Sequence, residues 1–219
     1  MRQLILDLIP DNPPSLANFT PGGNADALAA LASWLSPESC ETCLLLWGET
    51  GAGKTHLLKA AASCYVDAIA DPALGNIGDA PPPLLAVDNV QALDATGQVA
   101  LFNTFNRLRA AGGRLLAAAP LPPLQLELRE DLRTRLGSGL IFRLRPLSDE
   151  EKVAALTVQA TERGMRLPRE ALDYVFARAP RDMRSLSAFL AALDRYSLEH
   201  KRPLTLPLLR EVLQTPLEF

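Results

Sequence analysis

The chain has 219 residues, 48% of them hydrophobic, and a net charge of −3. This length is enough for one α/β domain and a small second domain. The acidic balance argues against a strongly basic nucleic-acid-binding surface, although 22 lysines and arginines could still be clustered locally. No stretch approaches the ~20 apolar residues of a membrane span, and the amino terminus has no long apolar core before a cleavage site. We therefore expect a cytoplasmic protein without a membrane segment.

The first predicted element is a helix that follows a polar, proline-bearing leading segment. Residues 1–24 form that segment, and residues 25–35 are rich in alanine and leucine. Asn24 stands directly before the apolar stretch, where an asparagine is a suitable N-cap. The pattern predicts a helix over 25–35.

A Cys-x-x-Cys pair follows at Cys40 and Cys43. Such a pair can form a redox couple or half of a zinc site. A four-ligand zinc site would need partners that Cys64 and two distant histidines are poorly placed to supply. We favour ordinary cysteines and expect no metal other than magnesium.

Residues 48–55 read Gly-Glu-Thr-Gly-Ala-Gly-Lys-Thr, a complete phosphate-binding P-loop. The glycines let successive N–H groups face the phosphates, Lys54 supplies a charge for the β- and γ-phosphates, and the Thr55 hydroxyl can ligate magnesium. An apolar run at 44–47 predicts a buried strand before the loop, and residues 56–63 have the composition of a helix. The predicted nucleotide-binding residues are Gly48, Glu49, Thr50, Gly51, Ala52, Gly53, Lys54, Thr55 and His56.

An acidic residue ends a later apolar run. A strand at about 65–69 is followed by an irregular connection at 71–83 that is rich in proline, glycine and aspartate. Residues 84–89 then read Leu-Leu-Ala-Val-Asp-Asn, which places Asp88 at the carboxyl end of a parallel strand beside the P-loop. Asp88 is predicted to hold the magnesium shell as a Walker B aspartate does. The alternative is a turn residue that ends the strand.

Alternation of strands and helices continues through the middle of the chain. A helical stretch at 98–111 ends at two glycines, and 114–119 is an apolar strand before a proline. An arginine-bearing segment at 128–135 precedes a short strand at 140–144. The pattern predicts an α/β fold, with a five-stranded parallel sheet flanked by helices.

After Pro146 the pattern is helical throughout. Ser148 and Glu151 form a predicted capping box, because each can satisfy a free N–H group of the other. Helices are predicted at 149–164, 168–178, 181–200 and 207–214. The predicted organisation is an N-terminal segment at 1–24, an α/β nucleotide-binding domain at 25–146 and a small all-α lid domain at 147–219.

These features together resemble an AAA+ module over nearly the whole chain, and four phrases resemble the DnaA family of bacterial replication initiators. The phrases are Asn-Phe-Thr-Pro-Gly-Gly-Asn at 18–24, Arg-Thr-Arg-Leu at 133–136, Pro-Leu-Ser-Asp-Glu-Glu at 146–151 and Arg-Asp-Met-Arg-Ser-Leu at 181–186. Within this family the chain is similar to the Hda branch, whose members inactivate DnaA. An initiator continues into a helix-turn-helix DNA-binding domain, and we expect this chain, which ends at Phe219, to lack one.

The resemblance implies roles for four further residues. Arg135 aligns with the arginine finger, which acts in trans on the nucleotide of a neighbouring subunit. Arg184 matches the sensor 2 position and would reach this protein's own phosphates, unless it is a solvated helix arginine. Phe19 and Asn24 match the segment near the adenine base, although a core phenylalanine and a helix N-cap explain them equally well.

The resemblance also implies slow hydrolysis of the protein's own nucleotide. Asn89 stands where many AAA+ proteins have an acidic residue that polarises the attacking water, and an amide cannot accept that proton. Alanines occupy 117–119, at the strand end where a polar sensor would contact water and the γ-phosphate. Binding needs neither group, so we expect ADP or ATP, with Mg²⁺, to be held rather than rapidly hydrolysed.

The extreme amino terminus resembles the short peptide by which partners dock on the replicative sliding clamp. In such a peptide the glutamine amide makes polar contacts and the leucines fill an apolar cleft as the segment becomes ordered. The same pattern would also suit an edge strand. The candidate clamp-binding residues are Gln3, Leu4, Ile5, Leu6, Asp7 and Leu8.

The implied function is regulatory inactivation of the initiator. A nucleotide-bound, clamp-tethered protein would present Arg135 to ATP held by DnaA and stimulate its hydrolysis, which prevents a second initiation. The implied partners are DnaA, the beta sliding clamp of DNA polymerase III, and DNA indirectly through the clamp, with no membrane. The sequence leaves open the choice between a monomer and a homodimer. The alternatives are an autonomous AAA+ ATPase and a DnaC-like helicase-loading adaptor.

Overall fold

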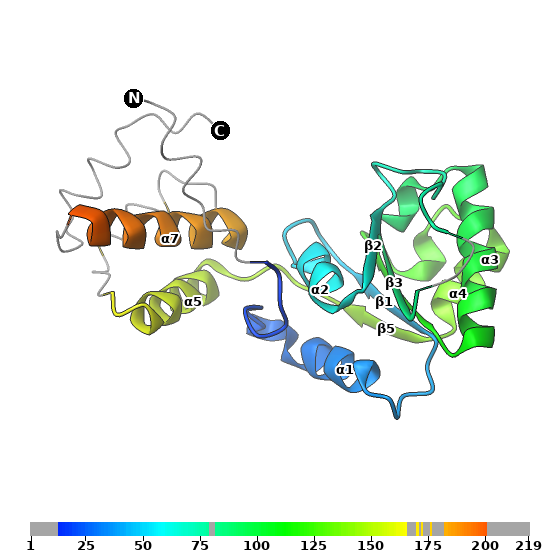
Figure 1. The fold of residues 1–219 in the computed structure, drawn as a ribbon, viewed down its shortest axis with the longest axis horizontal. Helices are drawn as coiled ribbons and strands as arrows, with labels where there is room; N and C mark the ends of the chain where they lie inside the picture. The colour runs from blue at the N-terminus through cyan, green and yellow to red at the C-terminus, as the bar shows by residue number, and fades with distance from the viewer. Residues whose placement is uncertain are drawn as a thin grey trace. The chain divides into compact units, whose positions relative to one another are not determined.

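The computed structural model describes residues 13–78, 82–165 and 182–200, together with the single positions 170, 172 and 176. These residues divide into two compact units at the bond between Pro146 and Leu147 (Figure 1). Residues 13–24 belong to the same unit as the α/β segment that follows them. Each unit has its own buried apolar core.

The first unit is built on a five-stranded sheet with the strand order β2-β3-β4-β1-β5, in which every neighbouring pair is parallel. Its strands are β1 (Cys43–Trp47), β2 (Cys64–Asp67), β3 (Leu84–Asp88), β4 (Arg114–Ala119) and β5 (Leu140–Arg143). The last residue of β1, Trp47, pairs with Ala119 and with Arg143, and Asp67 pairs with Asp88. The predicted five-stranded α/β fold is therefore confirmed, and its carboxyl edge brings these strand ends together.

Helices cover both faces of the sheet, which is why its central strands read as continuous apolar runs (Figure 1). One face packs on α1 (Ala25–Leu35) and α2 (Lys54–Ala61), and the other packs on α3 (Ala95–Ala111) and α4 (Glu130–Gly137). Side chains alternate along each strand, so Leu44 and Leu46 enter the first core while Leu45 enters the second.

Side-chain caps explain where two elements differ from the prediction. Helix α3 begins at Ala95, three residues before the predicted 98, because the Asp94 carboxylate accepts a hydrogen bond of 2.7 Å from the Gly97 N–H. Strand β2 ends at Asp67, two residues before the predicted 69, because its carboxylate accepts a hydrogen bond of 3.0 Å from the Ile69 N–H and turns the chain. Helix α1 has the predicted bounds.

The second unit contains α5 (Asp149–Glu162) and α7 (Met183–His200). The predicted capping box starts α5: the Glu151 N–H donates to the Ser148 hydroxyl at 3.2 Å, and the Ser148 N–H donates to the Glu151 carboxylate at 2.8 Å. The core of this unit comprises Leu156, Ala160, Met165, Leu172, Leu186, Leu190 and Leu193. The helices predicted at 168–178 and 207–214 lie mostly or wholly outside the described residues.

The cysteines have ordinary structural places. Cys43 is buried in β1 and Cys40 is exposed, and both are free. Burial raises the pKa of the Cys43 thiol to about 12, so this residue lacks the thiolate that redox or metal chemistry requires. In the part of the chain that the structure describes, no group of three or more histidine, cysteine, aspartate or glutamate side chains could hold a metal. None of the described helices is long and apolar enough to cross a membrane.

Candidate nucleotide-binding site

Residues 48–55 form a loop between the end of β1 and the start of α2, at the carboxyl edge of the sheet. Gly48, Gly51 and Gly53 have φ values of 146°, 82° and 92°. A Cβ atom would lie 2.1 Å from the Leu144 carbonyl oxygen at Gly48 and 2.6 Å from the ring of Phe19 at Gly53. Only glycine fits these positions, and the resulting loop leads into a helix N-terminus, where backbone N–H groups bind phosphate.

Lys54 is held over this loop by two backbone carbonyls. Its ammonium donates to the carbonyl oxygen of Gly48 at 2.6 Å and to that of Glu49 at 2.8 Å. Burial lowers the pKa of Lys54, and the nearby Asp88 carboxylate opposes this shift. A half-buried cation at the loop suits the phosphates of a nucleotide.

The remaining predicted loop residues divide into exposed and buried positions. Glu49, Thr50 and Gly51 are exposed, whereas Ala52 is buried under the loop. The Glu49 carboxylate lies 4.0 Å from the Arg143 guanidinium at the end of β5, in an exposed ion pair. Such a pair contributes little to stability, so these side chains are available to a ligand.

Thr55 and Asp88, the two residues predicted to hold magnesium, are in direct contact. The Thr55 hydroxyl donates to Asp88 Oδ2 at 2.6 Å. Asp88 ends β3 and is only 1% exposed. A hydroxyl and a carboxylate are the hard oxygen donors that Mg²⁺ prefers, and they meet beside the P-loop. The residues present therefore fit a nucleotide with its magnesium ion.

Two further groups bind the Asp88 carboxylate. The Tyr65 hydroxyl donates to Oδ2 at 3.1 Å, and the Asn89 N–H donates to Oδ1 at 2.9 Å. Tyr65 was not among the residues predicted from the sequence, because no motif marks it. The one signal in the sequence is its position two residues before the end of β2. Side chains alternate along a strand, so Tyr65 shares a face with Asp67, and the pairing of Asp67 with Asp88 places all three on the same face of the sheet.

Asn89 adopts a left-handed conformation with φ 54° and ψ 44°, which asparagine tolerates better than most residues. Its side-chain amide donates to the Asp67 carboxylate at 2.9 Å and so links the ends of β3 and β2. The residues at 117–119, at the end of β4, are buried alanines. Position 89, where an acid that polarises water was expected, thus carries an amide that is already bonded to Asp67. Positions 117–119, where a polar sensor was expected, are apolar.

Phe19 lies beside the P-loop, and its expected place near the adenine base stays a prediction. Its ring contacts Gly53, and its centroid is 5.5 Å from that of the His56 ring on α2. His56 Nε2 lies 3.0 Å from the Ser15 carbonyl oxygen. These contacts attach the segment before α1 to the first turn of the P-loop helix. Phe19 also packs on the apolar core, so the ring has both a structural place and a position next to the loop.

Asn24 is buried, and its side chain does not cap α1. Its amide nitrogen donates to the Arg145 carbonyl at 2.9 Å, and its oxygen accepts from the Arg145 N–H at 2.8 Å. The prediction of a side-chain N-cap was wrong, because a partner 121 residues away satisfies both polar groups. Asn24 thereby fixes the entry to α1 against the chain that follows β5.

Arg135 lies on α4, with its guanidinium carbon 5.7 Å from the ring centroid of Phe102 and 5.8 Å from that of Phe105. Helix α4 ends just before the start of β5. Gly139, between the two elements, packs against the carbonyl of Cys43, the first residue of β1. The P-loop follows the opposite end of β1. Arg135 is therefore at the edge of the sheet away from its own P-loop.

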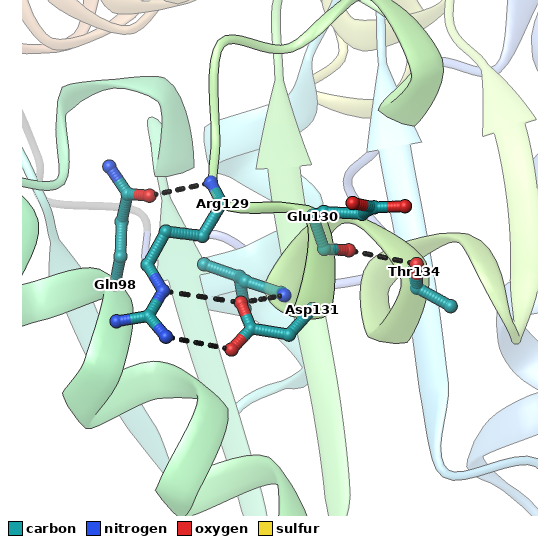
Figure 2. Close-up of polar contacts among 6 residues, drawn as sticks. Gln98, Arg129, Glu130, Asp131 and Thr134 are labelled. Carbon is teal, nitrogen blue, oxygen red and sulfur yellow. Dashed lines mark hydrogen bonds and ion pairs between the residues drawn. The ribbon is translucent and has the colours of Figure 1, made fainter.

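Arg129, just before α4, is bound within its own chain. Figure 2 shows its guanidinium paired with the Asp131 carboxylate at 2.9 Å, and its backbone N–H donating to the Gln98 side chain at 2.8 Å. The hydrogen bond from Arg129 lowers the pKa of Asp131. In the same view the Thr134 hydroxyl donates to the Glu130 carbonyl. These contacts fix the start of the helix that carries Arg135.

Two parts of the predicted site lie outside what the structure describes. Arg184 belongs to α7, but its side chain is not among the described ones. The candidate clamp-binding residues at 3–8 precede the first described residue. Both assignments stay predictions.

The chain is similar to proteins of known family. Residues 149–213 match the family model of the Hda lid domain. Domain III of the Thermotoga maritima replication initiation protein DnaA is 23% identical with a TM-score of 0.71, and the match covers 97% of this chain and 99% of that chain. AMPPCP-bound DnaA from Aquifex aeolicus is 23% identical with a TM-score of 0.66, over 89% of this chain and 71% of that chain. The Thermotoga maritima RuvB branch migration motor is 18% identical with a TM-score of 0.64, over 92% and 72%.

The sheet, its helices and the P-loop thus form an AAA+ fold of the kind found in DnaA and RuvB. A lid of the Hda type follows this fold in the chain. The chain thus combines, over nearly its whole length, the fold of DnaA domain III with a segment at 149–213 that is similar to the Hda lid domain.

Proposed function

We propose that this protein holds ADP or ATP with Mg²⁺ and, tethered to the sliding clamp, stimulates hydrolysis of ATP bound to DnaA. The position of Arg135 carries the proposal. It lies at the edge of the sheet away from its own P-loop and is held over two aromatic rings. In this proposal the arginine serves a nucleotide in a neighbouring AAA+ subunit, where its charge stabilises the transferring phosphoryl group.

The protein's own nucleotide is proposed to be retained. The P-loop, Lys54, Thr55 and Asp88 supply the groups that binding requires. Asn89, whose amide is bonded to Asp67, and the alanines at 117–119 supply no base and no polar sensor. In this proposal the hydrolysis takes place at the nucleotide-binding site of DnaA.

The amino-terminal peptide is proposed to supply the tether. Residues 3–8 would dock on the beta clamp loaded on DNA and raise the local concentration of the protein near DnaA. The tether adds no catalytic group. Clamp binding and the action of Arg135 are therefore separable by substitution.

The test measures hydrolysis of radiolabelled ATP bound to DnaA, with this protein added in the presence and absence of clamp loaded on DNA. We expect stimulation that needs the clamp, and we expect Arg135→Ala to reduce it by about a thousandfold while clamp binding persists. Arg109→Ala, at an exposed arginine in the last turn of α3, is the matched control and should keep full stimulation.

Three results would count against the proposal. Equal loss of clamp binding and stimulation in Arg135→Ala would remove the separation of roles. Substantial ATP turnover by the purified chain alone would favour an autonomous ATPase. Binding to replicative helicase and single-stranded DNA, with no effect on DnaA, would favour a helicase-loading adaptor.

A further inference from the structure

The Asp88 carboxylate is bonded on both oxygens. Oδ2 accepts from the Thr55 hydroxyl at 2.6 Å and from the Tyr65 hydroxyl at 3.1 Å, while Oδ1 accepts from the Asn89 N–H at 2.9 Å. An ionised carboxylate offers about four lone-pair positions, so three donors leave one position open. Such a group has a fixed plane and a defined direction in which a further donor can approach.

Tyr65 is the donor that the nucleotide-binding motifs do not explain. It projects from β2, the strand next to β3, on the face that packs against α2. Its ring packs on the apolar core of that face, which directs the hydroxyl to Asp88 Oδ2. The Lys59 ammonium lies 4.8 Å from the centroid of the same ring.

We propose that Tyr65 is a positioning residue of the magnesium site: its hydroxyl holds the Asp88 carboxylate in the orientation that receives the metal's water shell. The proposal rests on the proposed function only in that the chain binds a nucleotide with magnesium. Tyr65 itself touches neither metal nor nucleotide in this role.

Binding of magnesium by the Thr55 hydroxyl would remove one of the hydrogen bonds to Asp88. A hydroxyl that turns toward magnesium leaves Oδ2 with a single protein donor, Tyr65, and leaves Oδ1 with the Asn89 N–H. These two bonds, one on each oxygen, keep the carboxylate plane from rotating. Asn89 is itself fixed, because its side chain is bonded to Asp67. A pre-oriented acceptor loses little freedom when a ligand orders, which strengthens binding.

Removing the phenol oxygen tests this role. We expect Tyr65→Phe to weaken ADP binding in Mg²⁺ by about tenfold, measured by isothermal titration calorimetry, because a hydrogen bond to a charged group is lost. In excess EDTA the affinity should stay within about twofold of the original, since the P-loop contacts do not involve Tyr65. The selective loss of the magnesium-dependent part is the signature of positioning.

Lys59→Met is the matched control, because it removes the cation over the ring and leaves the hydroxyl bond intact. It should keep the full ratio between the affinities in Mg²⁺ and in EDTA. Equal weakening of Tyr65→Phe in both conditions would make Tyr65 merely structural and overturn the proposal, as would unchanged binding in both. A denaturant midpoint for each variant separates loss of folding from loss of metal response.

The outcomes distinguish this inference from the proposed function. A selective magnesium effect in Tyr65→Phe together with no stimulation of DnaA by the unaltered protein would support the role of Tyr65 and reject the regulatory function. Normal stimulation of DnaA by the unaltered protein, with no selective magnesium effect in Tyr65→Phe, would support the regulatory function and reject the role of Tyr65. Failure of the unaltered protein to bind ADP would reject both.

Discussion

The Arg135 guanidinium lies over the ring of Phe102, with its central carbon 5.7 Å from the ring centroid. The two side chains come from α4 and α3, so the contact ties the proposed arginine finger to the longest helix of the α/β unit. A cation over an aromatic face is attracted by the ring quadrupole. The ring thereby restricts the directions in which Arg135 can point.

We predict that Phe102→Ala lowers stimulation of DnaA-bound ATP hydrolysis by about fivefold, the value of a cation–π contact of roughly 1 kcal/mol. Phe102→Trp should keep full stimulation, since tryptophan is the better partner for a cation. Phe102 is half-buried, whereas Phe105 is a core residue, so the substitution spares the fold. Val99→Ala, at an exposed position on the same helix, is the control, and an equal loss there would contradict the prediction.

We predict that Asn24→Ala destabilises the α/β unit by about 2 kcal/mol, because two hydrogen bonds to the Arg145 backbone are lost in a buried place. Asn24→Asp should be at least as damaging, since a carboxylate cannot donate to the Arg145 carbonyl. The midpoint of urea unfolding measures the change. Asn103→Ala, at an exposed asparagine on α3, is the control. Equal urea midpoints for Asn24→Ala and Asn103→Ala would show that the hydrogen bonds of Asn24 to Arg145 do not stabilise the protein.

We predict that Arg114→Met destabilises the protein by about 2 kcal/mol, the loss expected for charged donors removed from backbone acceptors. The Arg114 guanidinium donates to the carbonyls of Trp34, Ser36 and Ser39, at the end of α1 and just beyond it. Arg114→Lys should recover only part of the loss, because an ammonium lacks the planar fork. Arg109→Met is the exposed control, and thermal unfolding compares the three.

We predict that the stabilising effect of Asp71 depends on pH. N–H groups of Asn76 and Gly75 donate to its carboxylate, which lowers its pKa below the ordinary 3.8. A carboxyl with a lowered folded pKa contributes stability above its unfolded pKa and loses it as the pH falls through the folded pKa. Asp71→Asn should therefore lower the unfolding free energy at neutral pH, and the difference should shrink in acid.

Urea unfolding between about pH 3 and pH 7 checks this sign. Glu127→Gln, at an exposed carboxyl, gives the baseline for a charge removed without such hydrogen bonds. A stability difference for Asp71→Asn that is constant or grows in acid would show that its hydrogen bonds do not depend on the charged form.

Local patterns determined much of the fold. The P-loop, the capping box at Ser148 and the bounds of α1 depend on residues within a few positions of one another, so the sequence predicted them correctly. Helix α3 and strand β2 differ by two or three residues, because single aspartates, Asp94 and Asp67, bond to nearby N–H groups that no periodicity reveals.

Tertiary structure decided the rest of the site. Sheet order places β2 beside β3, and only this pairing brings the Tyr65 hydroxyl to Asp88. The sequence marks Asn24 as a cap, but the chain after β5 returns to it and takes both of its polar groups. Arg135 is recognisable from its neighbours in sequence, yet its separation from its own P-loop follows from the direction in which α4 crosses the sheet. Contacts within one turn or loop are encoded by spacing, whereas contacts between strands and helices depend on topology and register, which spacing alone does not specify.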